Sequence, residues 1–198
     1  MPQININQGP MRDIYVIEPM VYGDKNGYFM ETFNAKSLRA HNIMAEFAYD
    51  NQSFATKGTL RGLHFQKKYS QSKIVRVIKG EVFYVVVDMR RDSKDYGKWF
   101  GITLSADNKQ QLYIGEGFAH GFLVTSDDAE ICYKCTDVHR ADDECGIAWN
   151  DPNIGIEWPG VTGTYRRSAF SRGYVLDGNV PLKLSDKDQR WLNMKDLS

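Results

Sequence analysis

Four histidines are the natural starting point for chemistry in this 198-residue chain, because imidazole is the side chain whose ordinary pKa lies near neutral pH. His41 falls in a polar, helix-like stretch, whereas His64 in "LRGLHFQ" and His120 in "GEGFAHGF" each follow glycines in strand-like runs. The glycine near His64 leaves open space beside the ring. Taken alone, "GTLRGLHFQ" favours a buried structural histidine, with a metal ligand and a catalytic base as the alternatives.

A metal site has little support in these residues. Small barrels that bind a metal commonly carry two closely spaced histidines with a carboxylate shortly after, but Gln66 occupies the position two after His64. His64 and His120 supply two neutral donors, fewer than the three protein ligands of a typical catalytic zinc site. The C-x-x-C of Cys132 and Cys135 has no second pair, and residues three apart on a strand point to opposite faces. We therefore expect no metal.

Acid–base chemistry without a metal needs a base, a group that fixes its tautomer, an oxyanion stabiliser and an acid across the substrate. Asp188, Lys73 and Tyr133 are the candidates beside a histidine base. Each also has a structural interpretation. Asp188 follows Ser185 in an S-x-x-D helix start, Lys73 opens a strand as edge lysines do, and a barrel-wall tyrosine usually packs. Spacing cannot bring these side chains together; only a fold can.

The composition favours a small or locally recognised ligand. Lys plus Arg (25) balance Asp plus Glu (25), so nothing favours nucleic acid or an anionic membrane surface as a partner. No targeting segment or apolar stretch of about 18 residues is present, and we expect a soluble, cytoplasmic protein. The three cysteines argue against a disulfide framework. The length predicts a single domain over residues 1–198.

Short runs rich in Val, Ile, Phe, Tyr and Leu make up most of the chain, which is typical of a sandwich or barrel. The clearest are "SKIVRVI", "EVFYVVVDM", "KWFGITL", "QQLYI", "GFLVT", "AEICYKCT" and "GIAWN". "VIKGEVFYVVVD" predicts a hairpin that turns at Lys79-Gly80, because glycine supplies the positive φ of a tight turn. Strands without alternating long helices exclude a doubly wound sheet and predict an antiparallel barrel.

Helix signals are few and peripheral. "NAKSLRAHN" predicts a two-turn helix capped by Asn34, and "LSDKDQRWLNMKDL" predicts a C-terminal helix capped by Ser185. Residues 160–183 are polar, rich in glycine and aperiodic, which predicts a long loop.

Eight segments in order resemble one known family. They are "VYGDKNGYFMETFN", "GTLRGLHFQ", "QSKIVRVIKGEVF", "VVDMRRDSKDYGKW", "LSADNKQQLYIGEGFAHGFLV", "AEICYKCTD", "GIAWNDPNIGIEWP" and "LSDKD". Over about residues 12–159 and 184–195 the chain resembles the dTDP-4-dehydrorhamnose 3,5-epimerases. The resemblance implies an all-β, antiparallel double-stranded β-helix or jelly-roll (cupin) barrel with short peripheral helices.

The resemblance also implies the reaction, an isomerisation that requires no cofactor and no metal. In the family's substrate, a nucleotide-linked 4-keto-6-deoxyhexose, the ketone at carbon 4 acidifies the protons on carbons 3 and 5. Removal of a proton gives an enolate, and return of a proton to the opposite face inverts the centre. The implied partners are a nucleotide sugar, dTDP-linked, and a second copy of the chain in a homodimer.

Matching the family's motifs assigns a role to each candidate. His64 would be the base, Asp188 its orienting carboxylate, Tyr133 the acid on the other side, and Lys73 would face the oxyanion. The matched substrate or nucleotide contacts are Glu31, Asn51, Arg61, His120, Glu144 and Lys187. Strand alternation places Arg61 on the face opposite His64, so Arg61 either serves a neighbouring subunit's site or bends in through a bulge.

The chain departs from the family's usual pattern outside the four catalytic positions. The departures are Asn26 for arginine, Tyr49 for glutamine, Tyr84 for aspartate, His139 for a second tyrosine, Gly115 for proline, and a longer loop after "IEWP". Loss of the arginine removes a charge-assisted phosphate contact, for which Lys25, Arg166 and Arg167 are candidate replacements. These departures leave the chemistry better supported than the identity of the nucleotide and sugar.

Three alternatives remain open from the sequence. Epimerisation at only one of the two carbons depends on how the sugar ring turns in the site. A 3,4-ketoisomerase on the same barrel tends to carry a second histidine two residues after the first, where this chain has Gln66. A non-catalytic sugar-binding barrel would leave the joint presence of base, orienting group, acid and lysine as coincidence.

Overall fold

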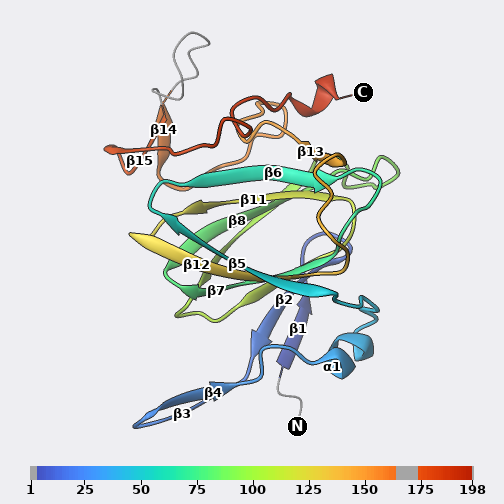
Figure 1. Cartoon of the computed structure of the whole chain (residues 1–198), viewed down its shortest axis with the longest axis vertical. Helices are drawn as coiled ribbons and strands as arrows, with labels where there is room; N and C mark the ends of the chain where they lie inside the picture. The colour runs from blue at the N-terminus through green and yellow to red at the C-terminus, as the bar shows by residue number, and fades with distance from the viewer. Residues whose placement is uncertain (1–3, 164–173, 198) are drawn as a thin grey trace.

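The computed structural model describes residues 4–163 and 174–197, which form two facing antiparallel sheets (Figure 1). In spatial order the six-stranded sheet contains β1 (Ile4–Gln8), β2 (Ile14–Pro19), β10 (Gln111–Ile114), β7 (Lys73–Lys79), β12 (Asp128–Cys135) and β5 (Tyr49–Thr56). The five-stranded sheet contains β13 (Glu144–Gly146), β6 (Leu60–Gln66), β11 (Phe118–Val124), β8 (Glu81–Asp88) and β9 (Trp99–Ser105). This all-β, antiparallel architecture confirms the predicted fold class.

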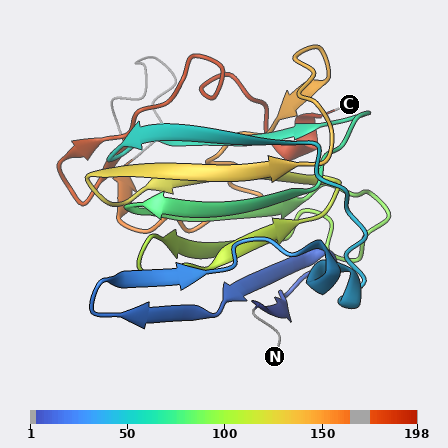
Figure 2. The same cartoon turned by 60° about the horizontal axis from the view of Figure 1, so that its bottom comes forward.

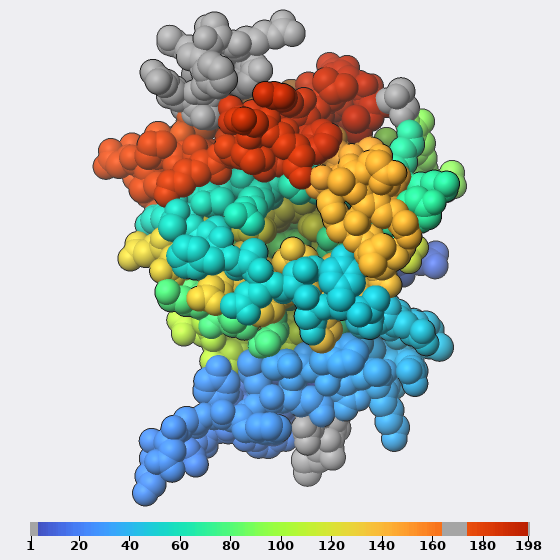
Figure 3. Space-filling view, viewed as in Figure 1, coloured from blue at the N-terminus to red at the C-terminus, as the bar shows by residue number. Residues whose placement is uncertain are grey.

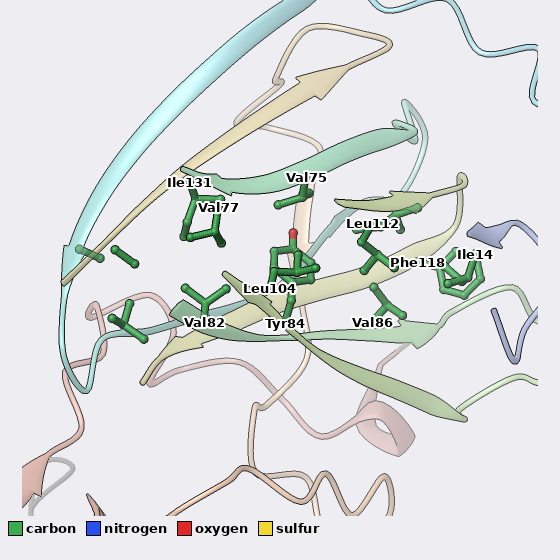
Figure 4. Close-up of a cluster of buried hydrophobic side chains, with 14 of the residues drawn as sticks. Ile14, Val75, Val77, Val82, Tyr84, Val86, Leu104, Leu112, Phe118 and Ile131 are labelled. Carbon is green, nitrogen blue, oxygen red and sulfur yellow. The ribbon is translucent and has the colours of Figure 1, made fainter. Parts of the chain in front are cut away.

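The main core lies between the two sheets (Figure 4). Val75 and Ile131 from the six-stranded sheet meet Val86 and Leu104 from the five-stranded sheet, and each of these side chains is almost completely buried. The other face of the five-stranded sheet is covered as well. There Val85, packed with residues such as Trp149 and Leu182, belongs to a second apolar cluster. Burial on both faces explains why β8 reads as a continuous apolar run instead of an alternating one.

The hairpin predicted for β7 and β8 is wrong. The chain does turn at Gly80, whose φ is +70° and whose Cβ, if present, would lie 1.9 Å from the carbonyl oxygen of Asp128. However, β7 pairs with β10 and β12, whereas β8 pairs with β9 and β11. The turn therefore carries the chain from one sheet to the other, and it does not join paired strands.

The N-terminal helix is confirmed and the C-terminal one is not. α1 (Ala35–Ala40) begins at Asn34, whose side chain accepts hydrogen bonds from the next turn's backbone. After Ser185 the chain instead forms turns and one short 3₁₀ helix, η1 (Met194–Asp196). Backbone groups of this C-terminal segment bond to residues that follow β13. The backbone N–H of Ala148 donates to the carbonyl of Leu192, and the backbone N–H of Met194 donates to the Asp151 carboxylate. These contacts replace helical hydrogen bonds.

The stretch 160–183, predicted as a loop, carries a small sheet in its described part. The strands are β14 (Val161–Gly163), β15 (Tyr174–Leu176) and β16 (Val180–Pro181). Apolar residues of this stretch pack onto the second cluster, Leu176 and Leu182 most deeply. Lys183 then bonds through its backbone to Gly58 and Leu60, which ties the C-terminal segment to the start of β6. The small sheet thus anchors the segment that contains Asp188.

A two-stranded hairpin projects from the other side of the barrel (Figures 1 and 2). It comprises β3 (Val21–Asp24) and β4 (Gly27–Met30). Its side chains include Tyr22, Tyr28 and Phe29, which are 50%, 60% and 65% exposed. Large apolar side chains gathered on a projecting arm are typical of a contact surface.

The helices among the described residues, α1 and η1, are far shorter than a membrane-spanning segment, and none of the helices there could cross a bilayer.

Candidate active site

A cavity of about 1020 Å³ opens between the two sheets. Figure 3 shows the surface hollowed between the cyan and teal region of β5 and β6 and the orange segment that leads to β13. Nine of the ten residues predicted for the site line it: Asn51, Arg61, His64, Lys73, His120, Tyr133, Glu144, Lys187 and Asp188. The fold therefore collects side chains from both sheets and from the C-terminal segment.

The shortest contact in the cavity joins His64 to Asp188. His64 Nε2 hydrogen-bonds Oδ1 of Asp188, whose side chain is almost completely buried. Oδ2 accepts a second hydrogen bond from Ser185 Oγ at 2.8 Å, and Ser185 Oγ in turn accepts the backbone N–H of Asp188 at 3.1 Å. The capping-type contact predicted from S-x-x-D and the contact to His64 are thus made by the same carboxylate.

This arrangement determines the tautomer of His64. An ionised carboxylate only accepts hydrogen bonds, so Nε2 carries the proton and Nδ1 holds the lone pair. Burial alone would raise the pKa of Asp188, but the hydrogen bond and charge of His64, with the Ser185 hydroxyl, bring that pKa below its ordinary value. Asp188 therefore stays ionised, and Nδ1 is the ring nitrogen of His64 that this hydrogen bond leaves unoccupied.

Glu144 lies on the other side of the same imidazole. Its Oε1 is 3.8 Å from His64 Nδ1, and both of its oxygens accept hydrogen bonds from Lys187 Nζ at 2.7 Å. His139 Nε2 is 3.8 Å from Oε2. Burial would raise the pKa of Glu144, but Lys187 and the two histidines lower it overall. Two carboxylates, Asp188 and Glu144, therefore flank His64.

Sequence reasoning missed a third neighbour of His64, Trp191. The two rings meet edge to face, with centroids 6.0 Å apart. Gly146 on β13 makes room for the indole, because a Cβ there would lie 2.4 Å from two of its ring atoms. The one signal available in the sequence is the position of Trp191 three residues after Asp188, in the segment that the resemblance assigns to the site.

A bulge in β6 brings Arg61 into the cavity. His64 is opposite His120 on β11, but Arg61 is opposite Phe122, so three residues of β6 match two of β11. The extra residue places Arg61 and His64 on the same side, which decides between the two readings left open by the sequence. Gly62 permits it: its φ is +127°, and a Cβ would lie 2.6 Å from the Cα of Gly121.

The opposite wall holds Lys73 and Tyr133. Both come from neighbouring strands inside the six-stranded sheet, β7 and β12, so Lys73 is not on an edge strand. Lys73 Nζ is 5.7 Å from the centroid of the Tyr133 ring. Burial lowers the pKa of Lys73, and electrostatic interactions with Cys135 and Glu144 offset part of this decrease. Burial raises the pKa of Tyr133, and the charge of Arg61 offsets part of this increase. The phenol of Tyr133 therefore keeps its proton.

His120 lies between these walls. It is directly opposite His64 in the pairing of β11 with β6, and its Nδ1 is 2.9 Å from the hydroxyl of Tyr84. Burial lowers the pKa of His120 well below its ordinary value, and electrostatic interactions with Lys73 and His64 lower it further. His120 is therefore an uncharged imidazole in the site.

Glu31, the tenth predicted site residue, and several departures from the family pattern lie in different parts of the fold. Glu31 does not line the cavity; its carboxylate accepts a hydrogen bond from Asn34 at 2.8 Å, beyond the end of β4. Asn26 lies in the turn of the hairpin, where its N–H donates to Asp24. Three further departures from the family pattern, Tyr49, Tyr84 and His139, line the cavity. Arg166 and Arg167 lie outside the described residues.

Comparison with known proteins identifies the family of the chain. A sequence profile of the family described as dTDP-4-dehydrorhamnose 3,5-epimerase matches residues 8–196. The chain belongs to this family. It is 45% identical to the dTDP-4-dehydrorhamnose 3,5-epimerase of Escherichia coli over 91% of this chain and 99% of that one. To the enzyme of that name from Methanothermobacter thermautotrophicus it is 43% identical, over 91% and 89%.

The fold of the family is shared in detail. An epimerase from Legionella pneumophila, solved with dTDP-4-keto-L-rhamnose, matches with a TM-score of 0.85 and 38% identity, covering 98% of this chain and 95% of that one. As a member of the dTDP-4-dehydrorhamnose 3,5-epimerase family, this protein is an isomerase with the barrel of its relatives.

Proposed function

We propose that this protein epimerises carbons 3 and 5 of a dTDP-linked 4-keto-6-deoxyhexose, converting dTDP-4-dehydro-6-deoxyglucose to dTDP-4-dehydrorhamnose. The observation that carries the proposal is the arrangement of one cavity, in which the His64–Asp188 pair lies on one wall and Lys73 with Tyr133 on the other. A base and an acid on different walls are what inversion of a C–H centre requires.

In the proposed first step, His64 Nδ1 takes the proton from the carbon next to the ketone. The electron pair of the broken C–H bond moves into the enolate, whose oxygen receives hydrogen bonds from Lys73 Nζ. Asp188 holds the imidazole through Nε2 and stabilises the imidazolium, as does Glu144 at 3.8 Å. The base therefore gains its proton between two carboxylates.

In the second step, Tyr133 donates its phenolic proton to the opposite face of the carbon, which restores the ketone and inverts the centre. Solvent returns the proton to Tyr133 and removes the proton from His64. Arg61, Asn51, His120 and Lys187 are proposed to hold the sugar and the diphosphate, because they line the same cavity.

Deuterium exchange tests this function. In D₂O the wild-type enzyme should place deuterium at carbons 3 and 5 of dTDP-4-dehydro-6-deoxyglucose and form dTDP-4-dehydrorhamnose, as observed by NMR of the product. Exchange at one carbon alone would favour single epimerisation, and movement of the carbonyl would favour ketoisomerisation. Absence of exchange at both carbons, with GDP- and CDP-linked analogues also unchanged, would contradict the proposal.

We further propose a homodimer in which the hairpin β3–β4 contacts the second copy. The exposed rings of Tyr22, Tyr28 and Phe29 support this, since three large apolar side chains in water are costly to leave uncovered. Light scattering should give a mass of twice 22.7 kDa, falling toward the monomer in Phe29→Asp. A monomeric wild-type protein at micromolar concentration would contradict the dimer.

A further inference from the structure

Tyr84 is a tyrosine inside the main core that nevertheless reaches the cavity. Its ring is only 4% exposed and lies among Val86, Leu104 and other apolar side chains of the cluster drawn in Figure 4. The side chain comes from the middle of β8, directly opposite Phe122 on β11. Its hydroxyl reaches Nδ1 of His120 at 2.9 Å.

Stacking fixes the geometry of this contact. The Tyr84 ring is nearly parallel to the rings of both His120 and Phe122, with interplanar angles of 14° and 20° and centroid distances of 6.0 and 6.2 Å. His120 and Phe122 are two residues apart on β11, so they present their side chains to the same face. The phenol is therefore held between two neighbours of one strand and has little freedom to turn away from Nδ1.

The direction of the hydrogen bond follows from counting donors. A phenol carries one O–H, and within the described residues the only hydrogen-bond partner of the Tyr84 hydroxyl is His120 Nδ1. If Nδ1 donated instead, the phenolic O–H would have no acceptor among the described residues, and buried donors in folded proteins rarely lack a protein partner. Burial also raises the pKa of Tyr84, so that its proton is retained. The hydroxyl donates and Nδ1 accepts.

We propose that Tyr84 is a positioning residue that holds His120 as the neutral tautomer with its proton on Nε2, directed to an oxygen of the bound sugar. Nε2 is the nitrogen left for a ligand, since Nδ1 is occupied and His120 lines the cavity. A neutral N–H donor adds a hydrogen bond without adding a positive charge beside Lys73 and His64. The role toward the sugar rests on the proposed function; the tautomer does not.

The first test is spectroscopic and needs no substrate. Long-range ¹H–¹⁵N spectra of the imidazole nitrogens, assigned through His120→Asn, should show His120 with a hydrogen-bonded, unprotonated Nδ1 and a protonated Nε2 between pH 6 and 8. In Tyr84→Phe the Nδ1 signal should move to the position of a bare nitrogen without a hydrogen bond. A protonated Nδ1 in the wild-type protein would overturn the proposal.

The second test is kinetic. Tyr84→Phe should lower kcat/KM for the nucleotide sugar about tenfold, whereas Tyr113→Phe should not change it. Tyr113 is a matched control because its buried hydroxyl contacts Ser72, outside the cavity. An unchanged kcat/KM in Tyr84→Phe would overturn the positioning role. A wild-type protein inactive on every nucleotide sugar would count against the proposed function, and the spectra would then decide the tautomer alone.

Discussion

The two walls of the cavity, the base wall with the proposed base His64 and the acid wall with the proposed acid Tyr133, differ in how many hydrogen bonds the protein makes to them. On the base wall, His64, Asp188 and Glu144 all have protein partners: Asp188 is bound by His64 and Ser185, and Glu144 by Lys187. On the acid wall, Lys73 and Tyr133 have no hydrogen bond to any described residue and meet only through a cation–ring contact at 5.7 Å. The proposed base is therefore held in place by the protein itself, whereas the proposed acid and its neighbouring lysine keep their donors free of the described residues.

This difference suits the two half-reactions. A base must hold one tautomer and be stabilised when it takes up a proton, which fixed carboxylates achieve. An oxyanion stabiliser and an acid must direct their donors at atoms of the substrate, and a competing protein acceptor would weaken both. Changes on the base wall should therefore abolish proton removal, and changes on the acid wall should alter what happens to the enolate.

The largest effect is expected for His64→Asn. It removes the base but keeps a polar side chain of similar shape, and kcat should fall by about 10⁴-fold, with deuterium exchange at both carbons lost. His41→Asn is the matched control, because His41 follows the last residue of α1 and, among the described residues, its imidazole hydrogen-bonds only the backbone carbonyl of Ser37. Retained exchange in His64→Asn would show that the base lies elsewhere.

Asp188→Asn should follow, with a fall in kcat of about 10³-fold. An amide can donate to Nε2, which would move the imidazole proton to Nδ1, the nitrogen required as the base. Substrate KM should change little, because Asp188 is buried behind the ring. A loss confined to KM would mean that Asp188 binds substrate and does not orient His64.

Lys73→Met should lower kcat by about 10²-fold, the usual effect of losing one oxyanion donor. Because burial lowers the pKa of Lys73, its charged form is unfavourable in the fold, so the variant should melt no lower than the wild type in a thermal scan. A large fall in melting temperature would assign Lys73 a structural role on this wall.

The smallest effect concerns stability in acid. The folded pKa of Asp188 lies below its unfolded value, so the carboxylate stabilises the fold above the ordinary pKa of about 3.9 and loses this contribution as pH falls through the folded value. Urea unfolding at pH 7 and pH 3 should show a smaller decrease in unfolding free energy for Asp188→Asn than for the wild type. An equal decrease would mean that other carboxyl groups account for it.

Local patterns predicted much of the fold. The strand runs match β7 to β12 closely, and Asn34 caps α1 as expected. Pairing could not be predicted, because the glycine at position 80 serves a hairpin and a crossing between sheets equally well. The prediction of a C-terminal helix was wrong for a related reason. The backbone of this segment and Asp188 bond to residues far away in the sequence, which the local sequence does not reveal.

The site shows the same division. Glycines and histidines in "LRGLHFQ" and "FAHGF" indicated two strands that line the candidate site. However, His64 and Asp188 are 124 residues apart, and their spacing in the sequence does not predict their contact. The position of Arg61 depends on a bulge that only the pairing of β6 with β11 creates. Tyr84 stood out in the sequence as a departure from the family, and its contact with His120 required the structure.

Tyr133→Phe in D₂O tests the separation of the two walls most directly. The variant keeps the base wall intact, so deuterium should still enter carbons 3 and 5 of dTDP-4-dehydro-6-deoxyglucose, while formation of the inverted sugar should fall by at least about 10²-fold. Product stereochemistry and deuterium content can be read from one NMR spectrum. Inversion at the wild-type rate, or loss of exchange together with inversion, would contradict the assignment of base and acid to opposite walls.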